Sequence, residues 1–169
     1  MTEIKKRAGG LALHMKCRSR LRHRRGHGVH SPLVYSLIRN VFMNKGAGED
    51  KYLHNKILEI GGSRKAARDA QNIYDHFGFS TFSLNNIENT FEGNRLYIFS
   101  DMLAGDSLLR TIDKGEMTGN ALVVIPDKSK ELKSLCKTIA EKHTGISIDR
   151  KDYFLYFYNG QYAKQHYKL

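Results

Sequence analysis

The sequence is poor in cysteine, and its two cysteines, Cys17 and Cys136, stand far apart in a chain of 169 residues. Their separation matches no metal-binding or redox motif, so we expect two reduced thiols in a cytoplasmic protein. Long hydrophobic runs are also missing. Apolar pieces such as 121–125 fall far short of the roughly 20 residues that cross a bilayer. The basic N-terminus is followed only by the short apolar piece 11–13, which is too little for a signal peptide.

Negative charge is scarce at the N-terminus. The chain has 28 Lys and Arg against 17 Asp and Glu, a formal net charge of +11. Residues 1–28 hold nine of these bases and one acid, which is +8 and leaves +3 for the rest. We therefore divide the chain into a basic arm, 1–26, and a single α/β domain, 27–169. Residues 5–25 could neutralise the phosphates of a nucleic acid or another anionic partner. We favour a solvated or self-docked arm over a nucleic-acid arm, because no base-stacking aromatic residue occurs in 1–34.

Two helices are expected in the first half of the domain. Ser31-Pro32 has the form of a helix start, with serine as N-cap and proline at the first helical position. Apolar residues then recur at helical spacing, which predicts a helix over 32–43. Ser63 similarly precedes a helical pattern over 64–77. A basic helix over 11–25 is a further expectation.

The stretch KILEIGGS, residues 56–63, allows two interpretations. Its apolar positions continue a helical pattern that begins near Leu53, and adjacent glycines commonly end helices. A strand followed by a Gly-Gly turn would instead resemble the start of a nucleotide-binding βα unit. The dinucleotide fingerprint requires three spaced glycines, whereas this stretch has two adjacent ones. We favour a helix, the Gly-Gly turn and a second helix.

The second half alternates short apolar segments with helical patterns. This alternation predicts an α/β sheet covered by helices on both faces. The expected strands are 79–84, 95–99, 121–125, 146–148 and 153–158, and the expected helices are 103–117 and 130–143.

Two segments resemble a known family. HGVHSPLVYSLIRNVF, residues 27–42, is similar to the N-terminal signature of a group of bacterial class I S-adenosylmethionine-dependent methyltransferases. SIDRKDYFLYFYNGQYAKQHYKL, residues 147–169, is similar to the end of the same proteins. The direct likeness covers 39 residues, and the order of strands and helices extends it from about residue 95 onward. The resemblance implies a truncated, three-layer Rossmann-like methyltransferase sheet with a C-terminal antiparallel hairpin and N-terminal helices.

The resemblance also implies where the cofactor would bind. In the family, a glycine-rich loop follows the first strand, and an acidic residue at the end of the second strand holds the ribose. Taking 79–84 as the first strand, the next residues are Asn85-Asn86-Ile87-Glu88, without glycine, and only ten residues, 85–94, precede the next strand. The second and third family strands are therefore missing. The expectation is a catalytically inactive or diverged methyltransferase-like protein with no cofactor and no catalytic residues.

A second alignment takes KILEIGGS as the first strand and its loop. It retains Glu59, Gly61 and Gly62 as a reduced site for S-adenosylmethionine, and it would permit an active methyltransferase. The two alignments differ in one observable, since 56–60 is a helix in the first and a strand in the second.

Other polar residues could form sites. Asp101 and Asp127 follow strands, at the edge where open α/β sheets bind ligands, although either could simply cap a helix. A metal site near HGVHSP is not expected because the neighbouring arginines would repel a cation. The same region could hold an anion against the opening N–H groups of the 32–43 helix. The anion-binding candidates are Arg24, Arg25, His27 and His30. His166 is expected to be structural, and the open edges of a small sheet make a homo-oligomer plausible.

Overall fold

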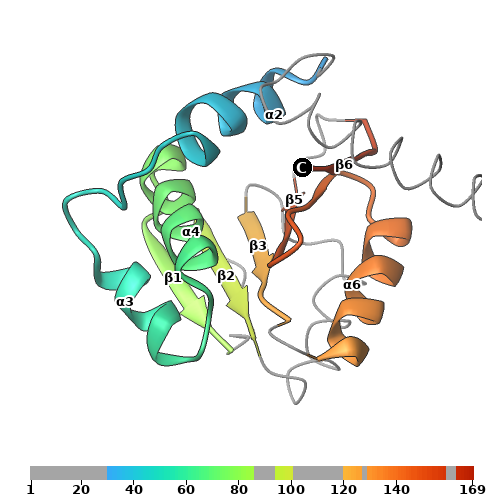
Figure 1. Cartoon of the computed structure of the whole chain (residues 1–169). Coiled ribbons are helices and arrows are strands. Elements are labelled where there is room, and N and C mark those ends of the chain that lie inside the picture. The colour runs from blue at the N-terminus through green and yellow to red at the C-terminus, as the bar shows by residue number, and fades with distance from the viewer. Residues whose placement is uncertain (1–29, 86–93, 101–119, 127–128, 159–162) are drawn as a thin grey trace, which may run out of the picture.

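The structure is a computed structural model, and it describes residues 30–85, 94–100, 120–126, 129–158 and 163–169. Its elements form a mixed α/β fold (Figure 1). The helices are α2 (Pro32–Ser36), the π-helix η1 (Leu37–Phe42), α3 (Tyr52–Glu59), α4 (Arg64–Phe77) and α6 (Lys130–Lys142). The strands are β1 (Thr81–Leu84), β2 (Arg95–Phe99), β3 (Asn120–Val124), β4 (Ile146–Asp149), β5 (Phe154–Tyr158) and β6 (Gln165–Lys168).

The six strands form one mixed sheet in the order β1-β2-β3-β5-β4-β6. The first three strands are parallel, and β5 lies antiparallel between β3 and β4. Strand β6 pairs in parallel with the outer side of β4. Consequently β1, β2, β3 and β4 all run in one direction, and their carboxyl ends lie along one edge of the sheet.

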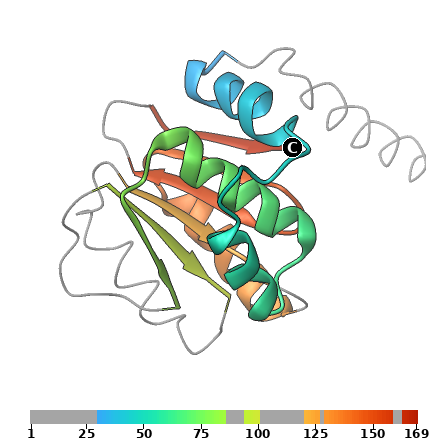
Figure 2. The ribbon, with the colours of Figure 1, turned by 90° about the vertical axis from the view of Figure 1, so that its left-hand side faces the viewer.

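Helices cover both faces of the sheet in the described part of the chain, which gives three layers (Figures 1 and 2). The larger core packs α2, η1, α3 and α4 against one face, and the smaller core packs α6 against the other. Alternation along β2 divides its side chains between the two cores. Leu96 and Ile98 point to the first, and Tyr97 and Phe99 point to the second.

The predicted 32–43 helix is present, with a change of winding. The Ser31 hydroxyl accepts a hydrogen bond from the Val34 N–H at 3.4 Å, and Pro32 opens the helix. From Leu37 the backbone is π-helical, so that the Met43 N–H bonds the Ile38 carbonyl, five residues back. Sequence periodicity does not distinguish this wider winding from an α-helix.

The helical interpretation of KILEIGGS is confirmed, and the strand interpretation is wrong. Helix α3 covers this stretch, with Leu53 and Ile57 buried and Asn55 between them exposed, whereas a strand would place all three on one face. Gly61 has φ 85°, a left-handed conformation that glycine adopts without steric cost. A Cβ on Gly62 would lie 2.9 Å from the Ile57 carbonyl oxygen. The two glycines therefore end α3 and turn the chain into α4.

The expected strands are present within two residues at either end, including the antiparallel β4–β5 hairpin. The 64–77 helix is confirmed together with its Ser63 cap, and the 130–143 helix is observed as α6. Strand β6 was not predicted. Its alternating polar side chains carry no apolar signal, and its pairing with β4 depends on a partner 19 residues away. The predicted helices over 11–25 and 103–117 lie outside the described residues. Among the described helices, none has the length and apolar character needed to span a bilayer.

Candidate anion-binding site

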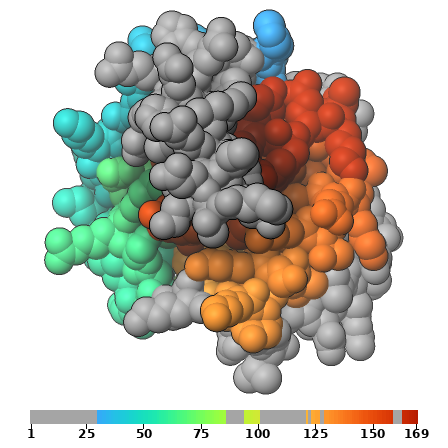
Figure 3. Space-filling view, turned by 45° about the vertical axis from the view of Figure 1, so that its right-hand side comes forward, coloured from blue at the N-terminus to red at the C-terminus, as the bar shows by residue number. Residues whose placement is uncertain are grey.

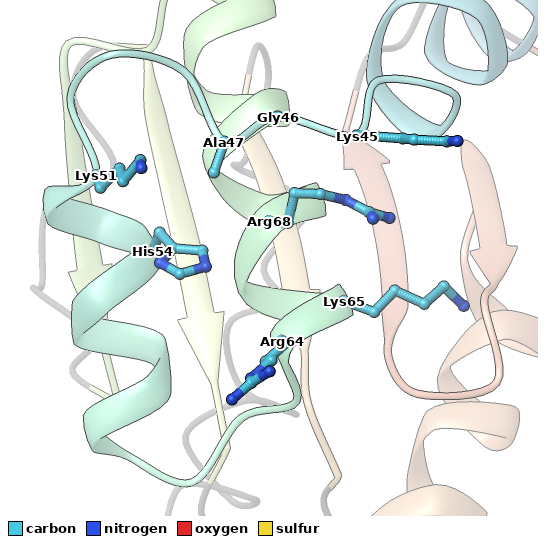
Figure 4. A pocket seen from close by; sticks show the side chains of 8 residues that line it. All are labelled: Lys45, Gly46, Ala47, Lys51, His54, Arg64, Lys65 and Arg68. Carbon is cyan, nitrogen blue, oxygen red and sulfur yellow. The ribbon is translucent and has the colours of Figure 1, made fainter.

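A basic pocket of about 530 Å³ lies over the first two turns of α4. Its walls come from three segments, namely the loop after η1, helix α3 and helix α4 (Figure 4). We call this site the basic pocket and define it by its lining residues. No acidic residue is among them, and they are Lys45, Gly46, Ala47, Lys51, His54, Arg64, Lys65 and Arg68.

The sequence positions these cations by burying the opposite side of α4. Ala66, Ala67 and Ala70 face the core, which leaves the basic residues of the first two turns outside. Arg64 and Lys65 occupy the first turn, where no acidic residue is present. Cations there oppose the partial positive charge of a helix N-terminus, and an anion would be favoured. The charge of Arg64 is therefore unfavourably placed at this helix end, and a bound anion would offset it.

The loop wall of the basic pocket is fixed by α4 itself. The Asn72 side-chain amide donates to the Gly46 carbonyl at 2.9 Å, and the Gly46 N–H bonds Asn44 Oδ1 at 3.0 Å. Helix α3 is held to α4 by the His54 N–H, which donates to Gln71 Oε1 at 3.1 Å. The three segments consequently keep a defined spacing without a ligand.

The pocket cations differ in their ion pairing. Lys65 Nζ lies 3.3 Å from an Asp152 carboxylate oxygen and donates to the Arg150 carbonyl at 3.1 Å. Burial, reinforced by the charge of Arg150, lowers the pKa of Lys65 despite this partner. Arg68 pairs with Asp69. By contrast, Lys45, Lys51 and Arg64 have no carboxylate within ion-pairing distance among the residues that the structure describes.

Beneath the pocket, the fully buried Asp69 carboxylate joins α4 to the β4–β5 hairpin. Oδ1 accepts from Arg68 Nε at 3.1 Å and Nη2 at 2.7 Å. Oδ2 accepts from Arg150 Nη2 at 3.1 Å and from the Tyr153 hydroxyl at 2.9 Å. The Arg150 guanidinium also lies 4.1 Å from the centre of the Phe42 ring. Burial, with the neighbouring Asp69 charge, raises the pKa of Tyr153 well above its usual value. Tyr153 therefore acts as a hydrogen-bond donor to the carboxylate.

The carboxyl edge of the sheet is tied together between β1 and β2. Asn85, directly after β1, has φ 51° and bonds the Ile98 carbonyl through its N–H at 2.8 Å. Its side-chain oxygen accepts from the Ser100 N–H at 2.7 Å, and its amide nitrogen donates to the Ser100 hydroxyl at 3.1 Å. Asparagine tolerates this left-handed conformation better than most residues. These bonds join the two strand ends at the edge where open α/β sheets bind ligands.

A second hollow, of about 400 Å³, lies between α6 and β6, which adjoin on one face of the molecule (Figure 3). Its lining mixes both signs of charge, so it has no preference for an anion. The lining residues are Lys137, Ala140, Glu141, Asp149, Phe154, Lys164, His166 and Lys168. The His166 ring nitrogen Nδ1 lies 2.8 Å from the Ser147 hydroxyl. Since Ser147 is 2% exposed, this pair holds β6 against β4 and presents no accessible nucleophile.

Most of the site residues singled out from the sequence are not among those that the structure describes. Arg24, Arg25, His27, Asp101 and Asp127 lie outside the described residues. His30 is exposed immediately before the Ser31 cap.

Glu59, Gly61 and Gly62 were the cofactor-binding residues of the second alignment, which required a strand at 56–60. They lie instead at the end of helix α3 and in the turn that follows it. Glu59 is 61% exposed and pairs with Lys56 at 2.9 Å, and Gly61 and Gly62 form the turn after α3. Within the described ranges, no group of three or more His, Cys, Asp or Glu residues could hold a metal ion.

Sequence reasoning missed the basic pocket. The available signal was three bases at positions 64, 65 and 68, in the first two turns of a helix where acids are usual. Comparison of the chain with protein-family models, curated proteins and solved structures gives no significant match.

Proposed function

We propose that this chain is a non-catalytic, methyltransferase-like α/β binding protein, and that its ligand is an anion held in the basic pocket. The observation that carries the proposal is the lining of the pocket, in which the described residues include five Lys and Arg, one histidine and no acid. The like charges of these residues repel one another, and a bound anion would relieve that repulsion. Arg64 and Lys65 lie in the first turn of α4, so the positive end of the helix dipole adds to their charge.

The methyltransferase-like part of the proposal is supported by the order of the strands. An antiparallel β5 is inserted between β3 and β4, which agrees with the C-terminal antiparallel hairpin that the resemblance implies. The proposed relationship is to a truncated Rossmann-like sheet, in which β1 corresponds to the first family strand and β2 to the fourth.

The lack of catalysis is supported at the carboxyl edge. Strand β1 pairs directly with β2, and only residues 85–94 connect them. No glycine follows β1 directly, and Asn85 bridges the two strand ends instead. The alternative, an active enzyme using Glu59, Gly61 and Gly62, depends on a strand where α3 lies. S-adenosylmethionine binding is therefore not part of the proposed function.

The test is isothermal titration calorimetry of the full chain with tripolyphosphate and with S-adenosylmethionine. We expect tripolyphosphate to bind and Arg64→Ala to weaken that binding at least tenfold. Lys130→Ala is the matched control, because Lys130 is an exposed base at the first position of another helix, α6. Micromolar binding of S-adenosylmethionine would overturn the non-catalytic proposal, and equal losses in the two variants would overturn the pocket.

A second candidate function is association with nucleic acid through the basic arm. It rests on the +8 charge of residues 1–28. Each phosphate neutralised by the arm would add to the salt dependence of binding. We would titrate RNA and DNA at several salt concentrations with the full chain and with a chain lacking residues 5–25. Unchanged affinity and salt slope after the deletion would dismiss the arm as the binding element.

A further inference from the structure

We infer that the ligand of the basic pocket is an oligophosphate, meaning two or more linked phosphate groups, recognised by its phosphates alone. This inference rests on the proposed function and names its ligand class. Three properties of the pocket support it, namely its net charge, its extent, and the absence of groups that would read a base or a sugar.

Charge is the first property. The pocket contributes five cations, and Arg150 behind it contributes a sixth. Among the described residues, Asp152 and Asp69 are the two carboxylates paired with this set, so the described group has a net charge of +4. A phosphate monoester carries about −1.5 to −2 at neutral pH. One phosphate therefore leaves about half of the positive charge uncompensated, and two or three linked phosphates come close to balancing it.

The extent of the pocket is the second property. Its volume of about 530 Å³ falls in the range that holds small organic ligands rather than one tetrahedral ion. The cations are spread around the pocket and do not converge on one point (Figure 4). Lys51 and His54 stand on the α3 side, whereas Arg64, Lys65 and Arg68 project from α4. A chain of phosphates could contact several of them together, which a single phosphate could not.

The third property is the absence of base or sugar recognition. Among the described residues, His54 is the one aromatic residue that lines the pocket, and none of the lining residues has a carboxylate that could accept ribose hydroxyls. The neighbouring Tyr52 packs against Phe82 with ring centres 5.8 Å apart, and Lys56 lies over its ring. Single-stranded nucleic acids depend on aromatic stacking for much of their affinity. The pocket therefore favours a compact oligophosphate over a nucleic-acid strand.

The variants for the test can be chosen so that folding is preserved. Lys65 and Arg68 also hold the hairpin through Asp152 and Asp69. Changing either base would therefore lower the free energy of unfolding as well as the affinity for the ligand. Lys51 and Arg64 make no ion pair within the described residues. Removing the Arg64 charge from the positive end of α4 should leave the free energy of unfolding unchanged or slightly higher.

The experiment compares phosphate, pyrophosphate, tripolyphosphate, ATP, citrate and a 12-nucleotide DNA by calorimetry at one pH and salt concentration. We expect affinity to rise at least tenfold from phosphate to tripolyphosphate. ATP should match tripolyphosphate within about threefold, because only its phosphates are recognised. Lys51→Ala and Arg64→Ala should each weaken tripolyphosphate binding at least tenfold, and Lys130→Ala should not. If the unliganded variants resist urea as well as the unsubstituted protein or better, misfolding is excluded as the cause of the weaker binding.

The outcomes separate this inference from the proposed function. If citrate binds as tightly as tripolyphosphate, or phosphate as tightly as pyrophosphate, the anion pocket stands and the oligophosphate inference is overturned. If the DNA binds more tightly than tripolyphosphate and needs Lys51 and Arg64, the ligand is nucleic acid. If none of these anions binds, both the inference and the proposed function fail.

Discussion

Asp69→Asn tests whether the buried carboxylate holds α4 to the β4–β5 hairpin. The substitution keeps the shape of the side chain and removes its charge. Both carboxylate oxygens now accept hydrogen bonds. In asparagine, an amide nitrogen would replace one of them and would face the donors either of Arg68 or of Arg150 and Tyr153. The side chain of Arg150 is only 7% exposed, so its charge would remain buried without its counterion.

The expected cost follows from that burial. Breaking a buried ion pair by removing one partner costs about 3–5 kcal/mol, because the other charge stays desolvated. Tyr153→Phe removes a single hydrogen bond to the carboxylate and leaves the ion pair, so we expect about 1.5–3 kcal/mol. Asp152→Asn is the matched control. Its carboxylate is 35% exposed and pairs with a Lys65 side chain that is 33% exposed, and such pairs contribute about 0–1 kcal/mol.

The assay is equilibrium urea unfolding followed by far-ultraviolet circular dichroism, since the chain has no tryptophan for fluorescence. With a urea dependence of about 2 kcal/mol per molar, Asp69→Asn should lower the midpoint by roughly 1.5–2.5 M. The slope of the transition should not change. A loss for Asp69→Asn no larger than that for Asp152→Asn would refute the reasoning, because the buried carboxylate would then contribute no more than a surface pair.

Two further predictions concern buried titratable groups. Burial lowers the pKa of His143, so the unfolded chain takes up a proton that the folded chain refuses. Stability should therefore fall as the pH drops below about 6.5, by at most about 1.4 kcal/mol per pH unit for this group, and His143→Gln should flatten the dependence. Burial raises the pKa of the Cys136 thiol to about 12. In a Cys17→Ser chain, this thiol should react with Ellman's reagent only after unfolding, and rapid reaction of the native protein would contradict its burial.

Local patterns in the sequence were sufficient for most of the fold. The Ser31-Pro32 cap and the apolar run of β2 are signals contained in a few neighbouring residues. Gly61 and Gly62 were interpreted correctly because the helical spacing of Leu53 and Ile57 outweighed the glycine pair. Strand β6 was missed because its polar residues become a strand only by pairing with β4.

The candidate site depends on longer-range contacts, and the sequence did not predict it. Asp69 lies in the middle of α4 as an apparently unpaired acid. Its partners Arg150 and Tyr153 follow 81 and 84 residues later. Lys45 and Lys51 belong to a loop segment that is held to α4 by the bond between Asn72 and the Gly46 carbonyl. No local period encodes such a meeting, so the sequence indicated an anion site near His27 and His30 instead.

The insertion of β5 between β3 and β4 also has a consequence for the order of folding. Pairing β4 with β5 closes a loop of residues 150–153. Pairing β3 with β5 closes a longer segment, residues 125–153, which includes α6. Loop-closure entropy makes the longer closure costlier by about 2 kcal/mol. We therefore expect the hairpin to form before it docks on β3, the step at which the two halves of the sheet first meet.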